Sequence, residues 1–113
     1  MPHCIVEYSK ELEAKVSPSE LLTAVYRGAL KSGLFVSDDI KTRSVSYENH
    51  TTGERVMDFI HVTAKILSGR SDALRANLSN CILAELTLID LSSITLTVEI
   101  CDMDRASYAK TVK

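Results

Sequence analysis

The chain has 113 residues, a length that suits one domain. Its 13 basic and 15 acidic side chains give a net charge of −2, and no lysine- and arginine-rich block stands out, so no nucleic-acid partner is expected. The N-terminus lacks the basic leader and apolar run of an export signal, and the apolar stretches are far shorter than the ~20 residues that span a bilayer. We therefore expect a cytoplasmic protein, folded as a single domain over residues 1–113, with no membrane partner.

The first part of the chain reads as a strand followed by a helix. Residues 3–8 are rich in β-forming side chains, which is typical of a short strand. Ser17, Pro18 and Glu20 predict a helix start, because Ser17 can cap the helix, Pro18 fits its first position and Glu20 can complete a capping box. Gly33 is a suitable end. The apolar stripe of this helix is Leu21, Leu22, Val25 and Ala29.

The rest of the chain repeats this pattern. Residues 40–47 predict a second strand, parallel to the first because a helix connects them. A polar turn over 48–55 leads to a third strand over 56–67. Ser71 caps a second helix, and residues 94–101 alternate as a fourth strand. The stripe predicted for the second helix is Leu74, Leu78, Cys81, Ile82, Leu86 and Ile89.

The element order is therefore β-α-β-β-α-β, an α/β (α+β) arrangement of two βαβ halves. Right-handed crossovers place both helices on one face of a four-stranded mixed sheet. The side chains expected to face the helices are Ile60, Val62, Ala64, Ile66, Ile94, Leu96, Val98 and Ile100. The opposite face is mixed, with Phe59, His61, Thr63, Lys65, Leu67, Thr95, Thr97 and Glu99. It is either an ordinary solvated face or a face enclosed by other subunits.

Three local stretches resemble one known family. Residues 2–9 (PHCIVEYS) and 58–71 (DFIHVTAKILSGRS) resemble the first and third strands of 5-carboxymethyl-2-hydroxymuconate isomerases, members of the tautomerase superfamily. The turn over 69–72 is also similar to one in the related 4-oxalocrotonate tautomerases, and Tyr108 and Lys110 fit the C-terminal pattern of the isomerases more loosely. The resemblance covers nearly the whole chain.

This resemblance implies a homotrimer that converts an unsaturated dicarboxylate or tricarboxylate between its dienol and ketone forms, as in homoprotocatechuate breakdown during aromatic catabolism. It implies that Pro2, exposed by removal of Met1, is the general base. A secondary amine can accept and return a proton only while it is neutral, and both burial and nearby cations lower the pKa of an amine. Such a proton transfer needs no cofactor and no metal.

Two arginines are candidate substrate-binding residues. Arg70 precedes the helix cap Ser71, and a helix N-terminus beside a guanidinium suits a carboxylate. The alternative for Arg70 is a surface salt bridge. Arg43, in the second strand, resembles a family arginine that contacts the substrate of its own or of a neighbouring subunit; alternatively it is a solvated residue paired with Asp38 or Asp39.

The remaining side chains offer no other chemistry. His3, His50 and His61 lack metal-ligand spacing, and phosphate-binding and nucleophile-elbow motifs are absent from the sequence. Cys4 is expected to be a core thiol. Two rivals remain open: another superfamily reaction, such as phenylpyruvate tautomerisation or haloacrylate hydration, and a non-enzymatic module that binds a small molecule for regulation.

Overall fold

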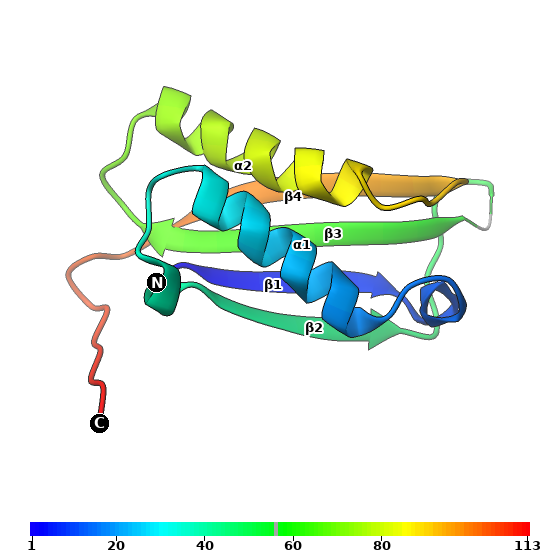
Figure 1. The fold of residues 1–113 in the computed structure, drawn as a ribbon, viewed down its shortest axis with the longest axis horizontal. Coiled ribbons are helices and arrows are strands. Elements are labelled where there is room, and N and C mark those ends of the chain that lie inside the picture. The colour runs from blue at the N-terminus through cyan, green and yellow to red at the C-terminus, as the bar shows by residue number, and fades with distance from the viewer. Residues whose placement is uncertain (56) are drawn as a thin grey trace.

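The computed structural model describes residues 1–55 and 57–113. Its helices and strands follow the predicted order, β-α-β-β-α-β, with two short 3-10 helices added after the first strand and before the second. The elements are β1 (His3–Ser9), α1 (Pro18–Lys31), β2 (Lys41–Tyr47), β3 (Asp58–Leu67), α2 (Asp72–Thr87) and β4 (Ile94–Met103). Both helices lie over the same face of the sheet (Figure 1).

The four strands form one mixed sheet in the order β2-β1-β3-β4. β1 is parallel to β2, with His3 opposite Lys41, and β3 is parallel to β4. The two halves meet at β1 and β3, which are antiparallel, with His3 opposite Lys65. The start of β1 and the end of β3 consequently lie at the same end of the sheet (Figure 1). The four-stranded mixed sheet with two helices on one face is confirmed.

The predicted strand bounds are close to those observed. β2 begins at Lys41, one residue later than expected, and β4 continues for two residues beyond the expected end, to Met103. β3 begins at Asp58, and the predicted start of this strand at Val56 lies outside the described residues. In the turn before β3, Thr52 and Arg55 pair in an isolated antiparallel bridge.

Serine side chains cap both long helices, as the sequence indicates. The Ser17 hydroxyl accepts a hydrogen bond from the Glu20 backbone N–H (3.1 Å), and Ser71 does the same for Leu74 (3.3 Å). The Glu20 carboxylate accepts a hydrogen bond from the Ser17 hydroxyl. It does not accept one from the Ser17 backbone N–H, as a capping box requires. After α1, Gly33 has a positive φ of 75°, which ends the helix at little steric cost.

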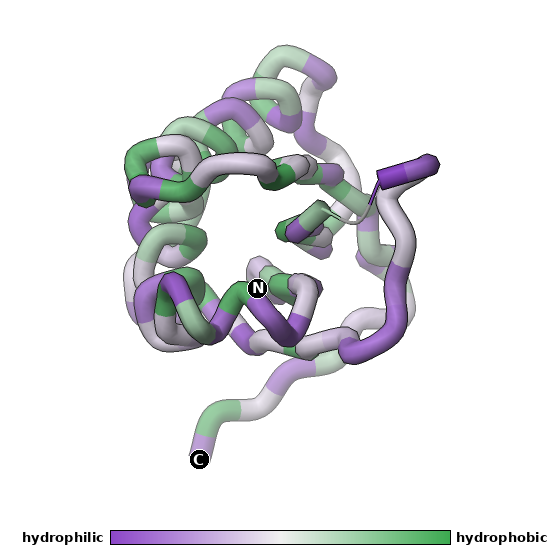
Figure 2. The backbone as a smooth tube through the Cα atoms, turned by 90° about the vertical axis from the view of Figure 1, so that its right-hand side faces the viewer, coloured by the Kyte–Doolittle hydropathy of each residue, from purple (hydrophilic) through white to green (hydrophobic). Residues whose placement is uncertain are grey.

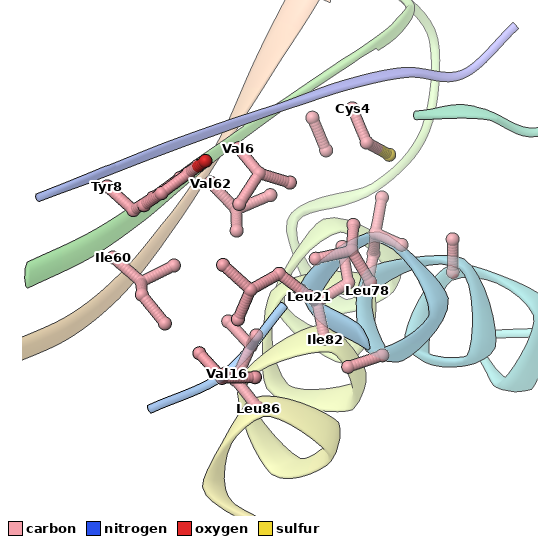
Figure 3. Packing of buried hydrophobic residues seen from close by; sticks show 14 of the residues in the cluster. Cys4, Val6, Tyr8, Val16, Leu21, Ile60, Val62, Leu78, Ile82 and Leu86 are labelled. Carbon is pink, nitrogen blue, oxygen red and sulfur yellow. The ribbon is translucent and has the colours of Figure 1, made fainter. Parts of the chain in front are cut away.

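The core lies between the helices and the sheet face that they cover. Cys4, buried as predicted, is one of several β1 and β3 side chains that point toward α1 and α2 (Figure 3). Both helices alternate between hydrophobic and hydrophilic segments (Figure 2). The fully buried strand and helix residues labelled in Figure 3 are Cys4, Val6, Ile60, Val62, Leu21, Leu78, Ile82 and Leu86. Leu74 was expected in the α2 stripe but is 43% exposed, because burial along this helix begins one turn later.

The two helices come into backbone contact at Gly28. A Cβ atom at this position would lie 2.5 Å from the Ile82 Cα and 2.9 Å from the Cys81 carbonyl oxygen. Glycine is therefore required here by the close approach of α1 to α2, which no helical periodicity in the sequence indicates.

Candidate active site

A cavity of about 260 Å³ lies at the end of the sheet where the chain begins. We call it the N-terminal cavity. Its apolar lining residues are Met1, Leu34, Phe35, Val36 and Leu67, and its polar ones are Asp39, Arg70, Tyr108 and Lys110. Antiparallel pairing of β1 and β3 brings the chain start and the β3–α2 connection together here, although Pro2 and Arg70 are 68 positions apart in the sequence.

The N-terminal amine is held where its charged form is disfavoured. Burial lowers the pKa of the Met1 amine, and the positive charges of Lys41 and Lys110 lower it further, whereas Asp39 partly opposes them. Pro2 follows directly and is fully buried, with its carbonyl oxygen accepting a hydrogen bond from the Lys41 backbone N–H (3.1 Å). An amine at this position is more often neutral near pH 7 than an ordinary α-amino group.

Arg70 lies in the short connection between β3 and the α2 cap. Its guanidinium donates long hydrogen bonds to the carbonyl oxygens of Leu67 (3.4 Å) and Leu34 (3.5 Å), and its Cζ lies 5.3 Å from the centroid of the Phe35 ring. No carboxylate within residues 1–55 and 57–113 forms an ion pair with it. The alternative of a surface salt bridge is therefore not what occupies this side chain, and its charge remains available to an anionic ligand.

Arg43 lies outside the N-terminal cavity, on the sheet face that the helices leave open. Its guanidinium donates to His3 Nδ1 (3.3 Å), and because arginine is only a donor, Nδ1 must be the acceptor. The proton of a neutral His3 ring is then on Nε2, which donates to the Tyr108 hydroxyl (2.9 Å). Burial and the neighbouring Arg43 charge both lower the pKa of His3, which favours this neutral form. Asp39 forms its ion pair with Lys110 rather than with Arg43.

Four cavity or near-cavity residues were not predicted as site residues: Lys41, Asp39, Tyr108 and Lys110. Lys41 could have been found from the parallel register, which places the first residue of β2 beside the first residue of β1. The tail has no periodicity that would place Tyr108 or Lys110, and its contacts with His3 and Asp39 span 105 and 71 residues of sequence. No group of three or more potential ligand side chains suited to a metal ion occurs in the part of the chain that the structure describes.

A larger hollow of about 500 Å³ lies elsewhere, between α1 and α2. Arg27 and Glu85 line it together with residues near the start of α1 and the end of α2. Neither the N-terminal amine nor Arg70 reaches it, so the smaller N-terminal cavity is the better candidate for proton-transfer chemistry.

Of the helices that the structure describes, none is both long and apolar enough to cross a membrane.

This mixed sheet under two helices is the fold of the tautomerase superfamily, and solved structures share it. A 5-carboxymethyl-2-hydroxymuconate delta-isomerase superposes with a TM-score of 0.84 at 15% identity, covering 99% of this chain and 89% of that one. A 5-carboxymethyl-2-hydroxymuconate isomerase from Deinococcus radiodurans R1 has a TM-score of 0.78 at 21% identity, covering 99% and 90%. A fused 4-OT symmetric trimer has a TM-score of 0.74 at 16% identity, covering 96% and 91%.

The family itself is established by sequence. A family model for 5-carboxymethyl-2-hydroxymuconate isomerase matches residues 2–112, and the chain belongs to this family of tautomerase-type isomerases. A search of curated proteins gave no significant match.

Proposed function

We propose that this protein converts an unsaturated dicarboxylate or tricarboxylate, such as 5-carboxymethyl-2-hydroxymuconate, between its dienol and ketone forms. The observation that carries this proposal is that Met1, whose amine has a lowered pKa, and Arg70, which has no acidic partner among the described residues, line one cavity. Removal of Met1 would leave the Pro2 amine next to this cavity. Membership of the isomerase family supports the reaction class. Homoprotocatechuate breakdown, a branch of aromatic catabolism, is the proposed context.

In the proposed mechanism, removal of Met1 converts the Pro2 nitrogen from an amide into a secondary amine. Arg70 binds a substrate carboxylate with its planar guanidinium and so orients the conjugated chain. The neutral Pro2 amine accepts the proton of the dienol hydroxyl, the conjugated electrons shift to form the ketone, and the protonated amine returns a proton to a carbon of the chain. The same nitrogen acts as base and then as acid. No electron is gained or lost, so the reaction as proposed requires no redox cofactor.

The substrate class is tested by Arg70 variants of protein whose N-terminus is confirmed as Pro2 by intact mass. With 5-carboxymethyl-2-hydroxymuconate, we expect Arg70→Ala to raise KM by about ten- to a hundredfold, because a charge-assisted contact contributes ~1.5–3 kcal/mol. Arg70→Lys should recover part of this loss, since a point charge replaces a planar fork. KM is measured from initial rates of the ultraviolet absorbance change.

Arg27→Ala is the matched control, because Arg27 is an exposed arginine on α1 outside the N-terminal cavity. An Arg70→Ala protein with the parent KM would place the carboxylate site elsewhere. Faster turnover of phenylpyruvate than of 5-carboxymethyl-2-hydroxymuconate by the parent protein would favour the rival superfamily reaction.

We also propose a homotrimer assembled through the open face of the sheet. This face carries the exposed hydrophobic side chains Val45 and Tyr47 beside a polar group in which His61 contacts Thr97 (2.7 Å) and Glu99 (3.0 Å). A neighbour of the same fold is a symmetric trimer, although a fused one. In such an assembly Arg43, on the same face, is proposed to reach the substrate of an adjacent subunit.

Sedimentation velocity at micromolar concentration should give about three times the 12.5 kDa chain mass. A second measurement on Val45→Lys should show smaller species, because a charge placed at a subunit contact is costly to bury. A parent protein that sediments as a clean monomer would contradict the trimer and the role of Arg43 in a neighbour's site.

A further inference from the structure

The C-terminal segment 104–110 is tied to the end of the sheet that carries the N-terminal cavity. The Arg105 guanidinium donates two hydrogen bonds to the Ser68 carbonyl oxygen (2.8 and 3.1 Å), just after β3. The Tyr108 hydroxyl contacts His3 Nε2 (2.9 Å) at the start of β1. In Figure 1 the tail leaves β4 at the end of the sheet where the N-terminus lies. These two contacts fix the direction of the chain just before Lys110.

Lys110 consequently lines the cavity that holds the N-terminal amine and Arg70. Its Nζ lies 2.9 Å from Asp39 Oδ1, and both side chains are partly exposed, at 36% and 43%. Ion pairs at this exposure add little stability, because water screens the attraction and two flexible side chains must be ordered. A ligand carboxylate can therefore replace Asp39 as the partner of Lys110 at small cost.

The charges of the cavity are unbalanced in the direction that favours an anion. Arg70 and Lys110 contribute two positive charges and Asp39 contributes one negative charge. The two cations come from different parts of the chain: Arg70 from the β3–α2 connection and Lys110 from the tail. The cavity therefore presents two cationic groups rather than one, and a ligand with two carboxylates can use both.

We propose that Lys110 is a second carboxylate-binding residue of the N-terminal cavity, which exchanges Asp39 for one end of a dicarboxylate while Arg70 binds the other end. The identity of the ligand class rests on the proposed function. In the unliganded protein Asp39 holds the Lys110 ammonium in place, and the hydrogen bond between them lowers the pKa of Asp39 and raises that of Lys110. Both groups are thus ionised over the neutral pH range, which the exchange requires.

The alternative role for Lys110 is a structural tie that secures the tail through Asp39. The two roles predict different effects for the two partners. If the ion pair serves only as a tie, Lys110→Met and Asp39→Asn break the same contact and change ligand binding in the same direction. If Lys110 binds the ligand, Lys110→Met weakens dicarboxylate binding, whereas Asp39→Asn removes a competitor and strengthens it.

The probes are trans,trans-muconate and sorbate, which share a six-carbon diene chain and differ in one end group, a carboxylate in muconate and a methyl in sorbate. Neither has an enol to tautomerise. Affinities are measured by NMR titration of the full-length protein with Pro2 as its first residue. We expect Lys110→Met to weaken muconate binding about five- to tenfold and to change sorbate binding less than twofold. Asp39→Asn should strengthen muconate binding about two- to threefold.

Lys113→Met is the control, because Lys113 is an exposed lysine in the same tail that does not line the cavity. It should leave both affinities unchanged. Equal losses for muconate and sorbate, an unchanged muconate affinity, or losses from both Lys110→Met and Asp39→Asn would overturn the proposal. Because neither probe reacts, a protein that fails to isomerise 5-carboxymethyl-2-hydroxymuconate but gives the expected affinity pattern would refute the proposed function and leave this inference standing.

Discussion

Protein that retains Met1 is expected to have about 10²- to 10⁴-fold lower kcat/KM than protein that begins at Pro2, because general acid–base catalysis contributes about that factor. In the retained form the Pro2 nitrogen is an amide and cannot accept a proton. The comparison uses two preparations of one sequence whose N-termini are identified by intact mass. Both should have the same fold and assembly, since the difference is one residue, Met1, which precedes β1.

Pro2→Ala in the processed protein separates the amine from the proline ring. A primary amine at this position remains a base, so we expect a smaller loss of kcat, about ten- to a hundredfold. Circular dichroism and sedimentation should match those of the parent protein. Undiminished activity in protein with confirmed, retained Met1 would refute the role of the nitrogen altogether.

The pH dependence follows from the direction of the pKa shift. The base acts in its neutral form, so kcat/KM should rise with pH through the pKa of the amine and then level off. Burial and the charges of Lys41 and Lys110 lower the pKa of the Met1 amine in the unprocessed chain. The Pro2 amine of the processed protein lies one residue further along, where the same cations should lower its pKa, so this rise should be centred below the pKa of a free proline amine. Lys41→Met removes one of these charges and should move the rise to higher pH.

Gly28→Ala is expected to lower the free energy of unfolding by about 1–3 kcal/mol, the usual cost of overpacking a core. On an exposed helix the same change would gain ~1 kcal/mol from helix propensity. Here the added methyl meets the Ile82 Cα at 2.5 Å and the Cys81 carbonyl at 2.9 Å. Both are backbone atoms, so no side-chain rotation can make room and the helices must separate.

Thermal and urea unfolding at a fixed protein concentration measure this loss, because the stability of an oligomer depends on concentration. Asn80→Ala, at an exposed position of α2, is the control and should leave stability within about 0.5 kcal/mol of the parent. A Gly28→Ala protein more stable than the parent would mean that α1 and α2 are not held as closely as the structure describes.

The fold could be predicted because its signals are local. Alternation along β1, β3 and β4, and a serine at the start of each long helix, are sufficient to place the elements in order. The helix–helix contact could not be predicted, because it depends on two backbones meeting at Gly28. Nor could the burial of Glu85, which is 7% exposed and forms an ion pair with Lys31 of the other helix. A glutamate in a helix is expected to be exposed unless a partner for its charge is known.

The candidate site was predicted in part for the same reason. Arg70 could be chosen because it adjoins a helix cap, and Pro2 because of its place in the chain and the family resemblance. Lys110 could not, because its position depends on contacts that Arg105 and Tyr108 make with residues more than 35 positions away. Arg43 is a different case: its side chain contacts His3, and its proposed role requires a second subunit.

The arrangement of the two βαβ halves bears on how many proton-transfer sites of the proposed kind one chain can have. Because β1 and β3 are antiparallel neighbours at the centre of the sheet, the halves are related by an approximate two-fold axis, and the opposite end of the sheet is the counterpart of the N-terminal cavity. At that end, Met57 precedes β3 in the same way that Pro2 precedes β1. The buried residue Val16 precedes the α1 cap in the same way that Arg70 precedes the α2 cap.

A peptide chain has one amino terminus, so the internal symmetry of the sheet cannot duplicate the reactive nitrogen proposed here. Met57 is an internal residue whose nitrogen is a peptide amide, and Val16 offers no charge to an anion. The number of proposed proton-transferring amines in any assembly therefore equals the number of its chains.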